Sequence, residues 1–142
     1  MRVLRILMTP VLAVCIVAAF ACLPSRLCFE GGRDYTFYCG TSSSDCREIR
    51  AKSNAALTRL TLSSVCGEAV TFEASTFDLD KFLLSVKGEI VFKEELSDSV
   101  NYYCTADLPY SVNLYQSEIN LHVCVRKEGV KVASPIFSAG TD

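Results

Sequence analysis

Apolar and polar residues alternate along much of the chain beyond residue 30, with the period of two that is typical of β-strands with one buried face. The clearest run covers residues 119–126, where apolar side chains at odd positions alternate with mostly polar ones at even positions. Lys127-Glu128-Gly129 then supplies a turn, and the alternation resumes over residues 130–137. Two alternating runs around a short loop that contains glycine predict a β-hairpin.

A second alternating region lies in the middle of the chain. The apolar positions of residues 82–86 share one strand face, and the pattern continues over residues 90–92 after Gly88. We interpret this region as one long strand bent at glycine or as a hairpin at Gly88. Asp78 is a weaker, helical signal, because its side chain could cap a short helical turn.

Shorter alternating segments complete the predicted set of strands, and residues 40–56 are interpreted as loop, with at most a turn of helix. About seven strands at intervals of roughly 8–12 residues predict an all-β fold, an antiparallel two-sheet β-sandwich of the immunoglobulin-like type. A β-barrel is the alternative. The shorter segments are residues 35–37, 60–62, 70–74 and 100–104.

The N-terminal segment has the pattern of a secretory signal peptide. Arg2 and Arg5 precede an apolar run over residues 7–21 that ends in the small-residue pattern Ala-Phe-Ala. The run is shorter than the ~20 residues that a membrane span needs, so an uncleaved anchor is the weaker alternative. We therefore expect residues 1–21 to be removed and residues 22–142 to be a single secreted, extracellular domain.

Cysteine is unusually frequent, with eight in 142 residues. Behind a signal peptide such cysteines are expected to form disulfide bonds, and their spacing contains no pair typical of a zinc site. Cleavage after residue 21 removes Cys15 and leaves seven, so a free thiol or an intermolecular disulfide is expected. The pairing stays open, because six cysteines already allow 15 connectivities. The candidates for disulfide bonds are Cys28, Cys39, Cys46, Cys66, Cys104 and Cys124.

Composition argues against an enzyme and against a nucleic-acid-binding protein. Fourteen basic and 16 acidic residues give a net charge of −2, which excludes a strongly basic nucleic-acid binder. The single histidine, His122, lies on the polar side of its strand and is expected to face solvent or a sheet edge. With one imidazole and no glycine-rich phosphate loop, we predict no catalytic site, no cofactor and no metal.

Five segments of the chain carry a resemblance to a known family: Leu27-Cys28, Asp34 to Cys39, Phe77 to Leu83, Ser97 to Cys104 and Ile119 to Phe137. Together they resemble the ML lipid-recognition family, in its branch of lipopolysaccharide co-receptors of Toll-like receptors. Cys39 and Cys46 are also spaced like the small N-terminal disulfide loop of that family. Ser134 stands near the position of the late cysteine of the family, so the partner of Cys28 stays open.

The resemblance implies a β-sandwich cup that sequesters a lipid or glycolipid between two sheets. It further implies an accessory protein of innate immunity that presents this ligand to a receptor ectodomain, such as that of a Toll-like receptor. Burial of an acyl chain contributes ~0.8 kcal/mol per CH₂, so binding needs no catalytic group. Basic residues at the rim could meet an anionic headgroup: Lys81, Lys87, Arg126 and Lys127. The expected wall residues are Phe72, Phe82, Leu84, Val86, Ile90, Phe92, Leu121, Val123 and Phe137.

A second hypothesis needs no lipid cavity. A secreted, disulfide-stabilised ligand or antagonist with a packed core would bind its partner through its outer surface. Exposed tyrosines are frequent anchors of such interfaces. The candidate anchors are Tyr102, Tyr103, Tyr110 and Tyr115.

Overall fold

The computed structural model describes residues 14–15, 27–41 and 45–135, and every structural statement below refers to these residues. The predicted signal peptide, apart from Val14 and Cys15, lies outside them, as do Cys22 and Phe137. Within the described ranges, none of the helices combines the length and the apolar composition needed to cross a membrane.

Seven strands form one antiparallel sheet in the order β2-β1-β3-β9-β8-β5-β4, so β2 and β4 are the edge strands. The mostly antiparallel β-fold predicted from the alternation is confirmed at this level. A separate hairpin of two strands, β6 (Val112–Leu114) and β7 (Ser117–Ile119), follows β5. The strands of the large sheet are β1 (Asp34–Cys39), β2 (Arg47–Ala51), β3 (Val65–Phe72), β4 (Glu89–Glu95), β5 (Ser99–Thr105), β8 (Leu121–Arg126) and β9 (Val130–Ser134).

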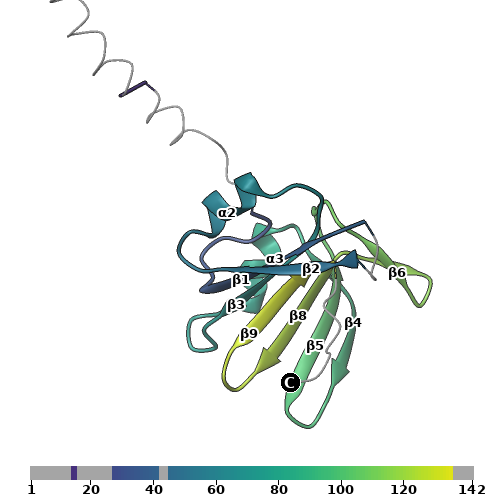
Figure 1. Ribbon diagram of the computed structural model, residues 1–142. Coiled ribbons are helices and arrows are strands. Elements are labelled where there is room, and N and C mark those ends of the chain that lie inside the picture. Colours follow the sequence, from purple (N-terminus) through teal and green to yellow (C-terminus); the bar gives the residue numbers. More distant parts are fainter. Residues whose placement is uncertain (1–13, 16–26, 42–44, 136–142) are drawn as a thin grey trace, which may run out of the picture.

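The large sheet is strongly twisted, as its strand directions show: β1 and β2 lie across the direction of β9, β8, β5 and β4 (Figure 1). Twist of one hand accumulates from strand to strand in any open sheet, and seven strands are enough to turn its two ends far apart in direction. Helices α2 (Ala55–Thr61) and α3 (Leu79–Ser85) accompany the sheet, and each contributes one buried residue to the core.

The two faces of the sheet differ in chemistry. We call the face that packs against α2 and α3 the inner face, and the opposite one the outer face. The registers place one row of apolar residues straight across the inner face, and the first four are buried: Tyr35, Val70, Val132, Val123 and Tyr102. The neighbouring row belongs to the outer face: Thr36, Ala69, Ala133, His122, Tyr103 and Phe92.

The region predicted as a strand over residues 82–86 is helix α3, so that prediction is wrong. Asp78 caps the helix, because its Oδ1 accepts the backbone N–H of Lys81 at 3.1 Å. Three apolar positions two apart are too few to distinguish a strand from a helix, and the cap was the better signal. Leu83 is therefore buried in the core, whereas Leu84 points outward and is 80% exposed.

A β-bulge in β4 separates two residues that were expected on one face. Ile90 pairs with Cys104 and Phe92 pairs with Tyr103, so Val91 is the extra residue. One inserted residue reverses the facing of everything after it, because side chains alternate along a strand. Ile90 thus belongs to the inner face and Phe92 to the outer face, where its ring stacks on Tyr103 at 4.4 Å.

Two further predictions fail between residues 45 and 62. Strand β2 lies within the predicted loop, and residues 60–62 belong to the end of α2 and its cap instead of a strand. Strand β2 reads Arg-Glu-Ile-Arg-Ala and lies at the sheet edge, and its alternation is only two apolar residues long, Ile49 and Ala51, which pack on the core. The predicted strands at 35–37 and 100–104 and the C-terminal hairpin of β8 and β9 are confirmed, whereas the strand predicted over 70–74 ends at Phe72.

Candidate functional site

Four phenylalanine rings form one contiguous cluster beside the inner face. Phe77 lies 5.3 Å from both Phe72 and Phe82, and Phe82 lies 5.9 Å from both Phe72 and Phe29, measured between ring centroids. The rings are tilted or edge-on to one another, as aromatic pairs prefer. Phe29 is buried, but the other three rings are only partly buried while still packed on the core. We call these four residues the phenylalanine cluster.

Four different elements bring these rings together. Phe29 precedes β1, Phe72 ends β3, Phe77 lies in the loop before α3, and Phe82 lies in α3. The capped start of α3 turns the chain back onto the sheet directly after Phe77. The cluster therefore depends on the β3–α3 connection and on the N-terminal segment being held in place.

A buried carboxylate holds the N-terminal segment. Glu68 is fully buried on the inner face, opposite Phe37, and its carboxylate accepts the backbone N–H groups of Cys28 at 3.1 Å and Phe29 at 3.3 Å. Burial raises the pKa of Glu68, while these N–H groups and the charge of Arg59 act in the opposite direction. Burial, followed by the nearby Glu68 charge, raises the pKa of the Cys28 thiol to about 12.

Tyr35 adds a second restraint on the same segment. Its hydroxyl donates to the carbonyl of Phe29 at 3.1 Å and accepts the N–H of Gly32 at 3.2 Å. With Glu68, it fixes both ends of the turn that presents Phe29 to the other rings. These polar groups were not singled out from the sequence, although a glutamate within the apolar run of β3 is a visible signal for Glu68.

The predicted wall residues are divided by the structure. Leu121 and Val123 are fully buried in the inner-face core, and Phe72, Phe82 and Val86 pack against that core with part of their surface exposed. Ile90 is on the inner face but 47% exposed, and Leu84 points away. Phe92 belongs to the outer face, and Phe137 lies outside the described residues. Phe29 and Phe77 join the site although the sequence analysis did not select them as wall residues.

Two of the predicted rim cations already have carboxylate partners. Lys81 Nζ lies 3.0 Å from Asp78 Oδ2, and Lys87 Nζ lies 3.2 Å from Asp107 Oδ2, in exposed pairs of little energetic weight. Lys81 immediately precedes Phe82 in the chain and so lies beside the phenylalanine cluster. The other two, Arg126 and Lys127, are at the exposed β8–β9 turn.

The outer face carries a ladder of stacked rings around the single histidine. Tyr103 lies between Phe92 and His122, with centroid separations of 4.4 and 4.6 Å. Glu94 Oε2 accepts from Tyr103 Oη at 3.3 Å and from Asn101 Nδ2 at 3.4 Å. Since the Asn101 amide nitrogen donates to Glu94, its oxygen accepts the Nε2–H of His122 across 3.2 Å.

His122 is only 3% exposed, so the expectation of a solvent-facing histidine is wrong. Burial first, and the positive charge of Lys131 second, lower its pKa from 6.5 to about 4. The imidazole is therefore neutral at neutral pH. The Tyr103 ring stacks on the imidazole, and Ala133 is its register partner on β9.

The cysteines are distributed over both faces. Cys104 is buried on the inner face, where burial raises the pKa of its thiol to about 11, and Cys124 is buried on the outer face. These two cannot bond to each other through the sheet. Cys46 and Cys66 are both exposed and lie near each other: burial first, and the neighbouring Cys66 thiol second, raise the pKa of the Cys46 thiol. Among the described residues no two cysteine sulfurs lie at bonding distance, and none of the described His, Cys, Asp and Glu side chains form a group of three suited to a metal ion.

No protein-family model, no curated protein and no solved structure matches the chain.

Proposed function

We propose that this chain is a secreted protein that binds the acyl chain of a lipid or glycolipid at the phenylalanine cluster. The observation that carries the proposal is the incomplete burial of three contacting rings, Phe72, Phe77 and Phe82, at the margin of the inner-face core. A contiguous apolar area that stays accessible is typical of a binding site, because water is readily displaced from it.

The proposal also includes the two-layer arrangement expected from the sequence. The twisted sheet sets β1 and β2 across β9, β8, β5 and β4, and an acyl chain entering beside Phe77 would lie against the inner face of these four strands. The resemblance to the ML family implies such an arrangement: a disulfide-stabilised, immunoglobulin-like sandwich with an acyl chain bound between its sheets. Delivery to a receptor ectodomain in innate immunity belongs to the same proposal.

The test uses the purified secreted chain and dansyl-undecanoic acid, a fluorescent fatty acid. Phe77 lies in a loop, so Phe77→Ser should leave the sheet intact while removing apolar contact area, and we expect affinity to fall at least about tenfold. Phe92→Ser is the matched control, because it removes the same ring from the outer face. Native mass spectrometry of the unmodified protein should show a co-purifying lipid.

Two outcomes contradict lipid binding at this cluster. One is a protein that neither carries lipid nor takes up the probe. The other is an equal loss of affinity in the Phe77 and Phe92 variants, which would place the probe elsewhere. Thermal unfolding of both variants shows whether either loss reflects unfolding.

A second candidate function is favoured by one residue of the outer face. Tyr115 is 84% exposed and lies 6.0 Å from the Phe92 ring, at the turn of the β6–β7 hairpin. Positive φ values at Tyr115 and Gln116 are those of the two-residue turn that joins such strands, and the turn holds the ring outward. A protein partner bound at this ring would be lost in Tyr115→Ser, with uptake of the fatty acid unchanged.

A further inference from the structure

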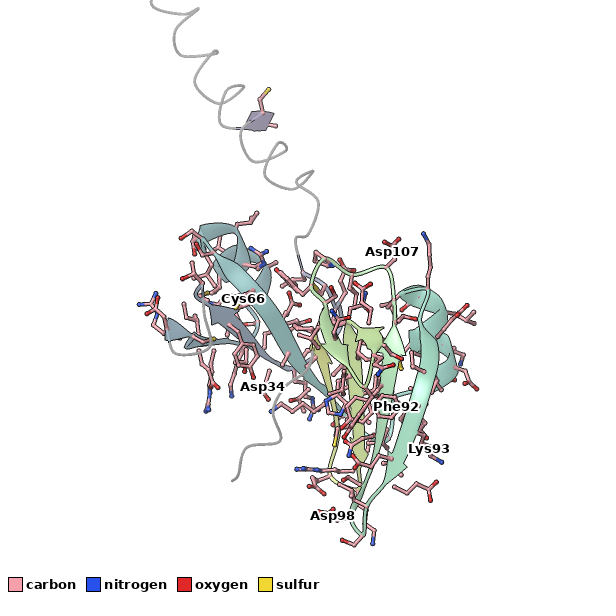
Figure 2. All side chains as sticks on the ribbon, turned by 90° about the vertical axis from the view of Figure 1, so that its right-hand side faces the viewer. Asp34, Cys66, Phe92, Lys93, Asp98 and Asp107 are labelled. Atoms are coloured by element: carbon pink, nitrogen blue, oxygen red, sulfur yellow. The ribbon has the colours of Figure 1, made fainter. Side chains whose placement is uncertain are left out.

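Strands β1 and β3 and the start of β2 bring three cysteines to one end of the sheet. Cys39 is the last residue of β1 and pairs with Arg47 on one side and Val65 on the other. Cys46 directly precedes the first of these partners and Cys66 directly follows the second. Figure 2 shows Cys66 on the side of the molecule away from Phe92 and Lys93 of β4.

A β-bulge decides where the Cys66 side chain points. Tyr38 pairs with Gly67 and Cys39 pairs with Val65, so Cys66 is the extra residue of β3. Its side chain is exposed, and its thiol donates to the carbonyl of Tyr38 at 3.3 Å. The bulge therefore turns Cys66 toward the end of β1, where the segment before β2 passes.

Gly40 allows that segment to approach. Its N–H donates to the carbonyl of Ser64 at 3.0 Å, which ties it to the chain just before β3. A Cβ atom at Gly40 would lie 2.7 Å from the carbonyl oxygen of Asp45 and 3.1 Å from Cys46 Cα. Because no side chain is present at Gly40, Cys46 closes around the end of β1 and lies near enough to Cys66 for the two thiols to influence each other.

The other described cysteines of the folded domain are placed differently. Cys39 packs against the inner-face core, so its side chain points away from the exposed pair. Cys104 and Cys124 are buried on opposite faces, and Cys28 packs beside Glu68. An exposed thiol near a second exposed thiol is the arrangement in which exchange with an external disulfide is unhindered.

We propose that Cys46 and Cys66 form a disulfide bond that links the start of β2 to β3 around the end of β1. The bond forms by exchange with a small-molecule or protein disulfide. One cysteine thiolate attacks this donor disulfide, forms a mixed disulfide and releases one donor thiol. The second cysteine thiolate then attacks the mixed disulfide, forms the Cys46–Cys66 bond and releases the second donor thiol. Two cysteine thiols are oxidised, and the donor disulfide is reduced to two thiols. This pairing differs from the Cys39–Cys46 loop that the resemblance to the ML family implies.

The test is a disulfide map of the full secreted chain, alkylated before denaturation and digested without reduction. Cleavage after lysine and arginine together with cleavage before aspartate separates Cys39 from Cys46, because Asp45 lies between them. The proposal expects the peptide Asp45-Cys46-Arg47 joined to the peptide Leu60 to Phe77, which contains Cys66. Cys39→Ser should keep this linked pair of peptides, whereas Cys46→Ser and Cys66→Ser should each lose it.

A second measurement does not depend on secretion. The purified chain, reduced and then incubated with oxidised glutathione, should form the same linked peptides. The double variant Cys46→Ser/Cys66→Ser should unfold roughly 10 °C lower than the oxidised wild type. A Cys39–Cys46 link, or alkylation of both Cys46 and Cys66 after incubation with oxidised glutathione, would overturn the proposal without bearing on fatty-acid binding.

Discussion

On the inner face of the sheet, apolar side chains meet helices and aromatic rings, whereas on the outer face a ladder of rings is joined to a hydrogen-bonded network. The inner face also buries the carboxyl group of Glu68, and the outer face buries the imidazole of His122. Burial disfavours the charged form in both cases, so it raises the pKa of the acid and lowers that of the base. The comparison teaches that the polar face of an amphipathic sheet can be as closed to water as its apolar face.

The largest expected difference between the faces concerns packing. Phe37 is fully buried on the inner face, and Phe37→Ala should lower the free energy of unfolding by about 3–5 kcal/mol. Phe92 on the outer face is only partly buried, and Phe92→Ala should cost about 1 kcal/mol through loss of its stack on Tyr103. Urea denaturation measures both, and equal losses would mean that the two faces carry equal packing energy.

The next effect in size is the acid sensitivity caused by His122. The folded-state pKa of about 4 is below the ordinary 6.5, so the unfolded chain binds more protons between these values. Stability should therefore be complete above pH 6.5 and decline as the pH falls toward 4, by up to about 3 kcal/mol. His122→Gln should remove this part of the decline, as urea denaturation at a series of pH values would show; a variant with the slope of the wild type would contradict it.

Glu68 should have the opposite and smaller pH dependence. Its raised folded-state pKa means that the folded chain binds more protons above the ordinary value of 4.5, so stability should fall as the pH rises through that region. The backbone N–H groups of Cys28 and Phe29 offset part of the cost of burying the charge, which is why we expect less than for His122. Glu68→Gln should flatten this fall, and Glu118→Gln on the exposed part of β7 controls for the loss of one charge. An unchanged pH profile in Glu68→Gln would show that the inner face does not disfavour the charge.

Regular alternation over a full-length strand predicted the structure well. The odd residues of β8, such as Leu121 and Val123, face the inner core as the pattern indicated, and the even residues face the other side. The break between the two alternating runs also predicted the turn at Gly129 correctly. The alternation could not predict the burial of His122, because the ring that stacks on the imidazole, Tyr103, comes from another strand.

The failures come from single residues that change a local rule. The bulge at Val91 reverses the facing of Phe92, and the valine side chain gives no sequence signal from which the bulge could be predicted. The Asp78 cap converts a short alternating segment into α3, so Phe82 reaches the phenylalanine cluster from a helix instead of a strand. Phe29 is unpredictable for another reason, since its position depends on hydrogen bonds to Glu68, 39 residues away.

The edge strands have a consequence for behaviour at high concentration. Strand β4 leaves one side of its backbone unpaired, yet four of its seven residues are charged: Glu89, Lys93, Glu94 and Glu95. A second molecule that tried to extend the sheet at this strand would bring carboxylates next to carboxylates, which opposes intermolecular β-pairing. Salt screens charges on an exposed strand edge, so it weakens this repulsion. Fibril formation, followed by thioflavin fluorescence, should therefore begin sooner at high ionic strength than at low ionic strength.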